Sequence, residues 1–444
     1  MEAPRRPSFG QLGRTDSEYW RGMGASPWRG VSAGRDQQRG RMDGLHADRV
    51  APPQRKKMQD SPASEDVVLA DMRQRLRTVL DFELIQYERI VTALNNNRLF
   101  RLQAADGLRV VVKLYYRDDR RRLEREYGIL RFLQERHVSR VPTPLLRCDQ
   151  HNYAIYSHEP GVTKRSADLT TAEVTNIARF AVDLHRIRPG DPGADFPPVA
   201  VGCFSVAEKV AAIRERLAPW MQFATGMDAS PAVRELYADI DVGTVFDALL
   251  ATVTAGLSAA ERTATTPPED RRLDSGDFAP HNVLVRPDGG VCVLDFENAG
   301  WDQPLALTAC FLTAATALDL GGDQVTAFLR TYRAAIPLSN EDVIRFERLC
   351  ALQHLYWCAI HLSLTTPAQL TRKRFANPDL DAEAVTMDQI RHFRHRLALS
   401  EAAVAGAPWR SDNRTEGETD QTPSSGNRVP RDGERAYGEV REWR

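Results

Sequence analysis

Residues 275–285 read SGDFAPHNVLV, and residues 291–297 read VCVLDFE. Asp277 stands five positions before Asn282, and Asn282 leads into a short apolar run that is typical of a strand. A turn of Pro, Asp and Gly then reverses the chain, and a second apolar run delivers Asp295 at its end. The sequence therefore predicts two carboxylates and one carboxamide at the same end of a hairpin.

Phosphoryl transfer from a nucleotide needs such a set of groups. One carboxylate orients the attacking hydroxyl and accepts its proton, while a second carboxylate and a carboxamide hold Mg²⁺ through oxygen atoms. Any one of these residues also occurs in ordinary surface turns. The ordered set with its flanking strands is more specific, and it favours Mg²⁺-dependent phosphoryl transfer.

The stretch resembles the catalytic and metal-binding loops of the aminoglycoside phosphotransferase and choline kinase-like family, which shares the protein-kinase fold. The resemblance implies that Asp277 is the catalytic base and that Asn282 and Asp295 are the metal ligands. Residues 299–304 resemble the family's Gly-Asp-Pro segment. One position departs from the family pattern, because Ser275 stands where a His is common. The resemblance implies that this position supports the loop and takes no part in proton transfer.

A lysine in the N-terminal half gives independent support. Lys113 lies in an apolar, β-branched run, where a buried ammonium is costly unless an anion accompanies it. Glu126 follows on the helix predicted over residues 118–135, with leucines four and seven positions later as in the family; Glu124 is the alternative. The resemblance implies an ion pair that directs Lys113 to the phosphates of ATP or GTP. Taken alone, a solvated Lys and Glu would be the plainer interpretation.

Two further nucleotide-binding features follow from position in this fold. Residues 156–161 are expected to form the hinge, so the backbone of Ser157 and His158 is expected to bind the nucleotide base. The turn over residues 94–98 contains three Asn and no Gly, where a protein kinase has a glycine-rich loop. Asn can present backbone N–H groups to phosphate, but an ordinary hairpin turn fits this segment equally well.

The remaining strands and helices suggest an α+β protein. Runs at 99–102 and 108–115 predict an antiparallel hairpin, and residues 152–156 predict another strand. Beyond residue 161 the pattern is mainly helical, with helices over 170–186 and 206–223. The sequence thus predicts a two-lobed protein-kinase-like fold, with a small antiparallel β-sheet lobe and a larger helical lobe.

This plan divides the chain into four segments. They are a disordered basic tail (1–62), a small nucleotide-binding lobe (63–160), a helical catalytic and acceptor-binding lobe (161–406) and a disordered tail (407–444). Acidic residues are interspersed in the first tail, which favours a solvated segment over a nucleic-acid-binding arm.

Composition indicates where such a protein would work. The 444 residues are 42% hydrophobic and 27% charged, with a net charge of −1, values typical of soluble globular proteins. No apolar run is long enough to cross a membrane, and no signal peptide is recognisable. Six scattered cysteines favour a reducing compartment. A cytoplasmic protein without membrane or nucleic-acid partners is therefore expected.

Three further sequence patterns are explained as well or better by a structural role as by metal binding, acceptor binding or catalysis. Two Cys and two His recur over residues 350–361, but eleven residues of helix rise about 16 Å, so one helix cannot wrap all four around a zinc ion. Acids at 341–342 and 377–383 fit either a cationic acceptor or the starts of helices. His185 ends a helix and is expected to pack beside the catalytic loop.

The sequence therefore predicts a kinase that transfers the γ-phosphate of ATP or GTP, with Mg²⁺, to a hydroxyl of an unidentified small molecule such as an aminoglycoside, sugar or amino alcohol. One alternative is a catalytically inactive kinase-fold protein that binds a nucleotide or small ligand as a sensor. A protein kinase is disfavoured, because no Ala-Pro-Glu landmark follows Asp295. A nucleic-acid-binding protein with a basic arm is the last alternative.

Overall fold

The computed structural model describes residues 65–91 and 96–405. The predicted tails, 1–62 and 407–444, lie outside the described residues. From Met72 onward the chain forms one unit, which contains the sheets, the helices after α3 and the site discussed below. Within the described ranges, no helix is long and apolar enough to cross a membrane.

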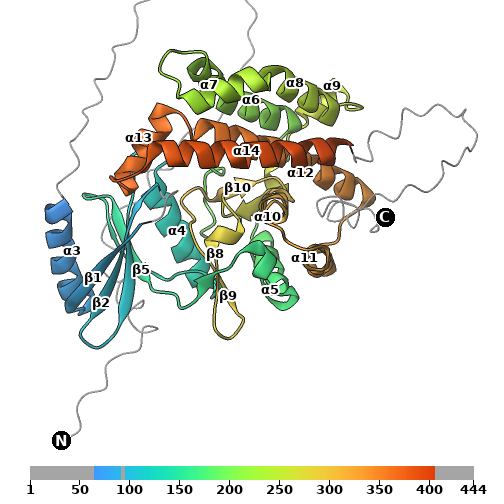
Figure 1. Cartoon of the computed structure of the whole chain (residues 1–444). Helices are drawn as coiled ribbons and strands as arrows, with labels where there is room; N and C mark the ends of the chain where they lie inside the picture. Colours follow the sequence, from blue (N-terminus) through green and yellow to red (C-terminus); the bar gives the residue numbers. More distant parts are fainter. Residues whose placement is uncertain (1–64, 92–95, 406–444) are drawn as a thin grey trace, which may run out of the picture. The chain divides into compact units, whose positions relative to one another are not determined.

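The N-terminal part contains a five-stranded antiparallel sheet in the order β1-β2-β3-β5-β4 and two helices (Figure 1). The elements are α3 (Glu65–Leu80), β1 (Leu84–Ile90), β2 (Arg98–Ala104), β3 (Arg109–Leu114), α4 (Arg122–Glu135), β4 (Pro144–Cys148) and β5 (Tyr153–Ser157). The hairpin predicted around residue 105 is confirmed as β2 and β3, which pair from Arg98↔Leu114 to Gln103↔Arg109.

Two of these strands and one helix start differ from expectation. Strands β1 and β4 were not predicted, because four central residues of β1 are exposed and β4 begins with a proline. The helix expected from residue 118 begins at Arg122. Asp118 Oδ1 accepts a hydrogen bond from the Arg120 backbone N–H (3.1 Å), and Arg121 has a left-handed φ of 52°. These two features form a turn before α4.

The remainder of the chain is mainly helical, as predicted. Its helices are α5 (Thr171–His185), α6 (Val206–Ala224), α7 (Pro231–Asp239), α8 (Val242–Val253), α9 (Ala259–Thr263), α10 (Ala306–Thr316), α11 (Gly322–Ala335), α12 (Asn340–Ser363), α13 (Pro367–Ala376) and α14 (Ala382–Ala405). Short strands form two small sheets, β6-β8-β9 and β7-β10, from β6 (Val162–Thr163), β7 (Arg272–Asp274), β8 (Val283–Val285), β9 (Val291–Val293) and β10 (Gly300–Asp302).

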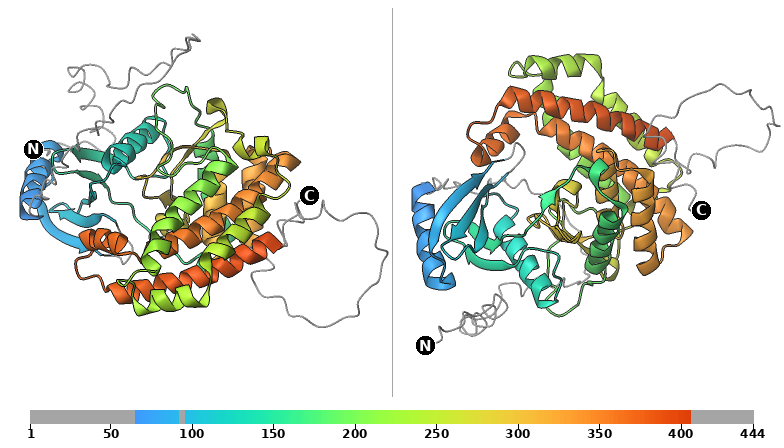
Figure 2. Two further views of the ribbon diagram at one scale, coloured as in Figure 1. Left: turned by 90° about the horizontal axis from the view of Figure 1, so that it is seen from above. Right: turned by 60° about the horizontal axis from the view of Figure 1, so that its bottom comes forward.

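Two apolar cores hold the site in place. The first includes Phe278, Val283, Val293 and Phe296, so the segments around the predicted catalytic residues are anchored in packed surroundings. The second joins α6, α7, α8, α12 and α14. Helix α12 contributes to both cores and runs against α14, as both views of Figure 2 show.

Two of the Cys and His residues of 350–361 and two of the acidic residues, at 342 and 381, form contacts that explain them without a metal or a ligand. His361 Nδ1 lies 2.8 Å from Gln389 Oε1, and Cys358 Sγ lies 3.7 Å from Ser400 Oγ, so α12 directs these groups at α14. Asp342 forms a capping box with Ser339 at the start of α12. The carboxylate of Asp381 accepts two backbone N–H groups at the start of α14. These acids serve as helix N-terminal groups.

Candidate active site

The loop that carries Asp277 begins directly after β7. Gly276 has a φ of 80°, and a Cβ there would lie 2.6 Å from the backbone of Asn298, so only glycine fits before Asp277. The side chain of Phe278 is fully buried and fixes the other side of the loop. Ser275 is buried as well, and its hydroxyl makes no hydrogen bond with the described residues. It supports the loop by packing.

The structure brings Asp277, Asn282 and Asp295 together. The amide Nδ2 of Asn282 donates to the Asp277 carbonyl oxygen (2.9 Å), and the Leu294 N–H donates to the Asn282 carbonyl oxygen (2.8 Å). The second bond places Asp295 beside Asn282. Asp295 has a left-handed φ of 65°, which costs energy for a residue with a Cβ and is frequent at functional sites.

His281 is a site residue that sequence reasoning missed. Its Nε2 lies 3.6 Å from Asp277 Oδ2. Burial lowers the pKa of His281, but the hydrogen bond and charge of Asp277, together with the charge of Asp295, outweigh burial and raise that pKa. A cationic imidazole can therefore accompany the predicted base.

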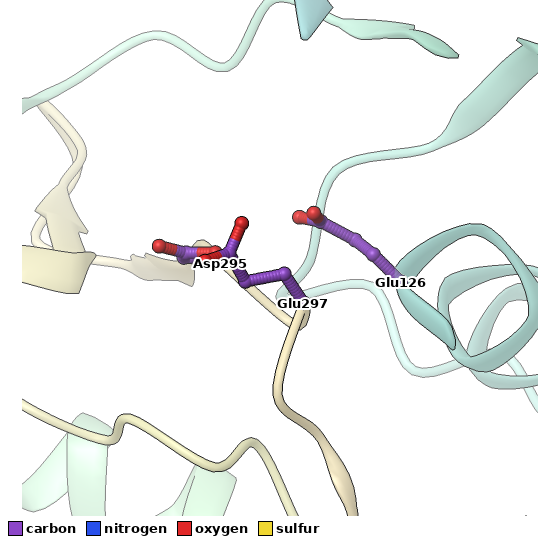
Figure 3. Close-up of side chains that lie close together, drawn as sticks. All are labelled: Glu126, Asp295 and Glu297. Atoms are coloured by element: carbon purple, nitrogen blue, oxygen red, sulfur yellow. The ribbon is translucent and has the colours of Figure 1, made fainter. Parts of the chain in front are cut away.

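Lys113 lies among three carboxylates. Its Nζ is 2.7 Å from Glu126 Oε2, 2.7 Å from Asp295 Oδ1 and 3.4 Å from Glu297 Oε2. Figure 3 shows the Glu126 side chain reaching from α4 toward Asp295 and Glu297. Glu126 also accepts from Tyr115 Oη (2.7 Å) and from the Phe296 N–H (3.2 Å). The alternative partner Glu124 instead pairs with Arg121.

Burial and charge act in opposite directions on this cluster. Burial would lower the pKa of the Lys113 ammonium, but the charges of Asp295, Glu126 and Glu297 raise it well above its usual value. Burial raises the pKa of Glu126 despite the neighbouring Lys113. Lys113 is therefore a permanent cation whose position is fixed by its carboxylate partners.

Glu297 and Arg122 were not predicted as site residues. Glu297 accepts hydrogen bonds from Arg122 Nη1 and from Asn97 Nδ2, and all three side chains are buried. Asn97 also accepts from the Tyr116 N–H through Oδ1 (3.0 Å). Glu297 could have been predicted as a site residue, because it stands only two positions after Asp295. Nothing in the sequence distinguished Arg122 from its neighbouring arginines.

The donor atoms of Asn282 and Asp295 fit an oxygen-binding cation. Because Asn282 Nδ2 is used by a carbonyl group, its Oδ1 is the atom left for a ligand role. Asp295 uses Oδ1 for Lys113, while its Oδ2 makes no hydrogen bond with the described residues. Mg²⁺ takes oxygen ligands and keeps several waters, so one carboxylate and one carboxamide suffice. Asp295 can also group with Glu126 and Glu297, three acids with ligand atoms within 4.8 Å of one another.

The predicted hinge residues lie at the end of β5. The Ser157 N–H donates to the Thr143 carbonyl oxygen (2.9 Å), and its hydroxyl donates to Glu159 Oε1 (2.7 Å). Both donors of Ser157 are thus used inside the protein. His158 is partly buried, and burial followed by the charges of Arg101 and Arg109 lowers its pKa. A role for either residue in binding the nucleotide base stays a prediction.

A cavity of about 50 Å³ lies directly beside the loop that carries Asp277. Its polar lining includes Asp274, Asp302, Lys209, Gln353 and Tyr356. Lys209 Nζ donates to Gln353 Oε1 (2.8 Å). Burial, then the charge of Asp302, raises the pKa of Asp274 to about 7, and burial raises the pKa of Asp302 to about 6.

His185, at the end of α5, is buried in the helical part. Its Nδ1 is hydrogen-bonded to the Tyr332 hydroxyl of α11, and burial followed by the charge of Arg188 lowers its pKa to about 3. It therefore joins two helices as a neutral group.

Comparisons with known proteins identify the fold and the family of this chain. A model of the phosphotransferase enzyme family matches residues 89–345. A solved spectinomycin phosphotransferase, in complex with ADP and spectinomycin, is 11% identical with a TM-score of 0.54, over 75% of this chain and 98% of that chain. Choline kinase from Cryptosporidium parvum is 14% identical with a TM-score of 0.52, over 78% of this chain and 98% of that chain. Plasmodium vivax ethanolamine kinase is 14% identical with a TM-score of 0.50, over 76% of this chain and 89% of that chain. A search of curated proteins gives no match.

At these identities the solved structures establish the fold, and the predicted kinase-like architecture is confirmed. The family model covers more than half of the chain and includes both the Lys113 strand and the Asp277 loop. This chain belongs to the phosphotransferase enzyme family.

Proposed function

We propose that this phosphotransferase transfers the γ-phosphate of ATP, with Mg²⁺, to a hydroxyl group of a small molecule. The observation that carries the proposal is the convergence of Asp277, Asn282 and Asp295 at one side of the Lys113–Glu126 pair. The solved spectinomycin phosphotransferase contains ADP, which supports an adenine nucleotide; GTP is the alternative.

Each group has one task in the proposed reaction. Asp277 takes the proton of the acceptor hydroxyl while the hydroxyl oxygen forms a bond to the γ-phosphorus. The bond between that phosphorus and the bridging oxygen breaks, and the nucleoside diphosphate leaves. Lys113, held by Glu126, stabilises negative charge on the phosphates. Mg²⁺ on Asn282 and Asp295 would neutralise further phosphate charge.

An amine of the acceptor is proposed to lie in the cavity of about 50 Å³ beside Gly276, with the acceptor hydroxyl outside the cavity at Asp277. The buried carboxylates of Asp274 and Asp302 line this cavity. They favour an acceptor that carries an amine as well as a hydroxyl, among the aminoglycosides, sugars and amino alcohols that the sequence left open. The predicted lobe boundaries, 63–160 and 161–406, are part of the same proposal.

Isothermal titration with ATP and with GTP, each with and without Mg²⁺, tests the nucleotide site. The wild type is expected to bind ATP in a metal-dependent way, and Asp295→Ala is expected to weaken that binding. Binding would then justify a screen of amine-bearing alcohols for phosphorylation. If neither nucleotide binds to the wild type, the proposed function is wrong and only the family and the fold remain.

A further inference from the structure

Helix α13 brings two cations, Arg372 and Lys373, to the nucleotide side of the site. The helix contacts strand β2, and both views of Figure 2 show it close to the sheet. Its C-terminal end is fastened there by two arginines of the sheet: Arg98 Nε donates to the Phe375 carbonyl oxygen (2.8 Å) and Arg89 Nη2 to the Ala376 carbonyl oxygen (2.9 Å). The position of α13 beside the sheet is thus fixed by side chains.

A chain of ion pairs links this helix to the Lys113 cluster. Arg372 Nη2 lies 3.3 Å from Asp118 Oδ2, and the same oxygen accepts from Arg122 Nε (2.9 Å). Arg122 in turn donates to Glu297, whose carboxylate lies 3.4 Å from Lys113 Nζ. The guanidinium groups of α13 and α4 therefore lie next to the groups that are proposed to hold the phosphates.

Lys373 lies deeper than Arg372, with only 4% of its surface exposed. Burial, followed by the charge of Arg372 and with a smaller contribution from Arg122, lowers its pKa to about 8, against the charges of Glu297 and Asp277, which raise it. The ammonium is thus within electrostatic reach of both Glu297 and the predicted catalytic base.

Several cations lie close together in this region, since the charge of Arg122 acts on both Arg372 and Lys373. Arg122 is almost fully buried, yet its Nη2 makes no hydrogen bond with the described residues, and neither does Arg372 Nε. Burial, followed by the charges of Arg122 and Arg120, lowers the pKa of Arg372 to about 10. Like charges packed together in a region of low dielectric repel strongly, and a bound anion would relieve that repulsion.

We propose that Lys373 and Arg372 of α13, together with Arg122 of α4, bind the β- and γ-phosphates of the nucleotide. This inference rests on the proposed function. It also fits the segment 94–98, of which residues 94 and 95 lie outside the described residues: the segment contains no Gly, and the Asn97 side chain is already used by Glu297 and Tyr116. Cationic side chains from a distant helix would supply phosphate contacts that a glycine-rich loop supplies in protein kinases.

Lys373→Met tests this role, and Arg374→Met is the matched control because Arg374 is the next residue on the same helix and is exposed. Affinities for ATP, ADP and AMP are measured by calorimetry with Mg²⁺, and thermal melting reports folding. Loss of one charged hydrogen-bond donor is expected to weaken ATP binding roughly 10- to 100-fold. AMP binding should hardly change, and Arg374→Met should match the wild type for all three nucleotides.

A second measurement does not depend on how well Lys373→Met folds. The conservative variant Lys373→Arg keeps the charge at all accessible pH values, whereas the pKa of Lys373 is about 8. ATP affinity of the wild type should therefore decrease as the pH rises past 8, and that of Lys373→Arg should not. The charged groups that act on the pKa of Lys373 include Arg372, Arg122, Glu297 and Asp277.

The outcomes separate this inference from the proposed function. Unchanged ATP affinity in Lys373→Met, an equal loss of ATP and AMP binding, or identical pH profiles of wild type and Lys373→Arg would each refute the role of α13. In those cases the wild type still binds ATP and the proposed function stands. A wild type that binds no nucleotide contradicts the proposed function itself.

Discussion

Glu297 is 1% exposed, and its two carboxylate oxygens contact two cations and one amide. Removal of the carboxylate in Glu297→Ala leaves Arg122 and Lys113 buried with fewer anionic partners. Because an uncompensated buried charge is costly, the free energy of unfolding is expected to fall by about 3–5 kcal/mol. Denaturant unfolding at neutral pH measures this loss.

The control for that prediction is Glu124→Ala. Glu124 pairs with Arg121 at the surface of α4, and exposed ion pairs contribute only about 0–1 kcal/mol. A loss for Glu297→Ala no larger than that for Glu124→Ala would mean that Glu297 does not hold the cluster together.

Asp277 is expected to act only in the chemical step. Asp277→Asn keeps the size of the side chain and its backbone contact with Asn282, but removes the proton acceptor. Turnover should fall by about 10²–10⁴, while the affinity for ATP survives. Single-turnover phosphorylation and calorimetry of the same preparation check both parts. Asp288→Asn, in the exposed turn between β8 and β9, is the control; similar turnover in the two variants would remove Asp277 from the role of base.

At the scale of elements, the strands and helices that could be predicted are those whose sequence pattern lies within a few consecutive residues. The hairpin that carries Asn282 and Asp295 and the strand that carries Lys113 were predictable, because their apolar runs and turns lie within a few residues. Strand β1 was not, since its side chains are mostly exposed and its pairing with β2 depends on the finished sheet. The first turn of α4 was misplaced because Asp118 hydrogen-bonds to its own turn.

The contact between α5 and α11 should make the helical part sensitive to acid. The pKa of His185 is about 3 in the folded protein, below the usual value near 6.5. Its contribution to stability is therefore fully present above about pH 6.5 and is lost as the pH falls toward 3. His185→Phe should show a shallower decrease of unfolding free energy between about pH 6.5 and 4, although the bond to Tyr332 is lost.

The measurement is a series of denaturant unfolding curves across that pH range. His137→Asn is a suitable control, because His137 is exposed and its left-handed φ of 59° is tolerated by Asn. The control should keep the acid sensitivity of the wild type. An equally steep acid dependence in His185→Phe would show that the linkage comes from other groups.

At the scale of the whole molecule, the site depends on contacts that no local pattern reveals. Arg122 and Glu297 are separated by 175 positions, and Arg98 and Phe375 by 277. Only the finished tertiary structure brings α13 to the sheet, so Lys373 and Arg372 gave no signal in the sequence. The cavity beside Gly276 likewise combines residues of β7, β10, α6 and α12. The proximity of the candidate residues Asp277, Asn282 and Asp295 could therefore be predicted from motifs, and the charged groups that surround them could not.

The solved spectinomycin phosphotransferase matches 98% of its own length to 75% of this chain. A complete fold of this kind therefore needs fewer residues than the chain contains. Removal of residues 1–62 is expected to leave ATP affinity and the unfolding midpoint unchanged. Removal of residues 1–80 should instead destabilise the protein, because Met72 and Leu76 are 1% and 0% exposed and truncating such side chains costs about 2–5 kcal/mol each. If the shorter deletion already abolishes ATP binding, the predicted start of the nucleotide-binding lobe at residue 63 is wrong, and the first segment takes part in the site.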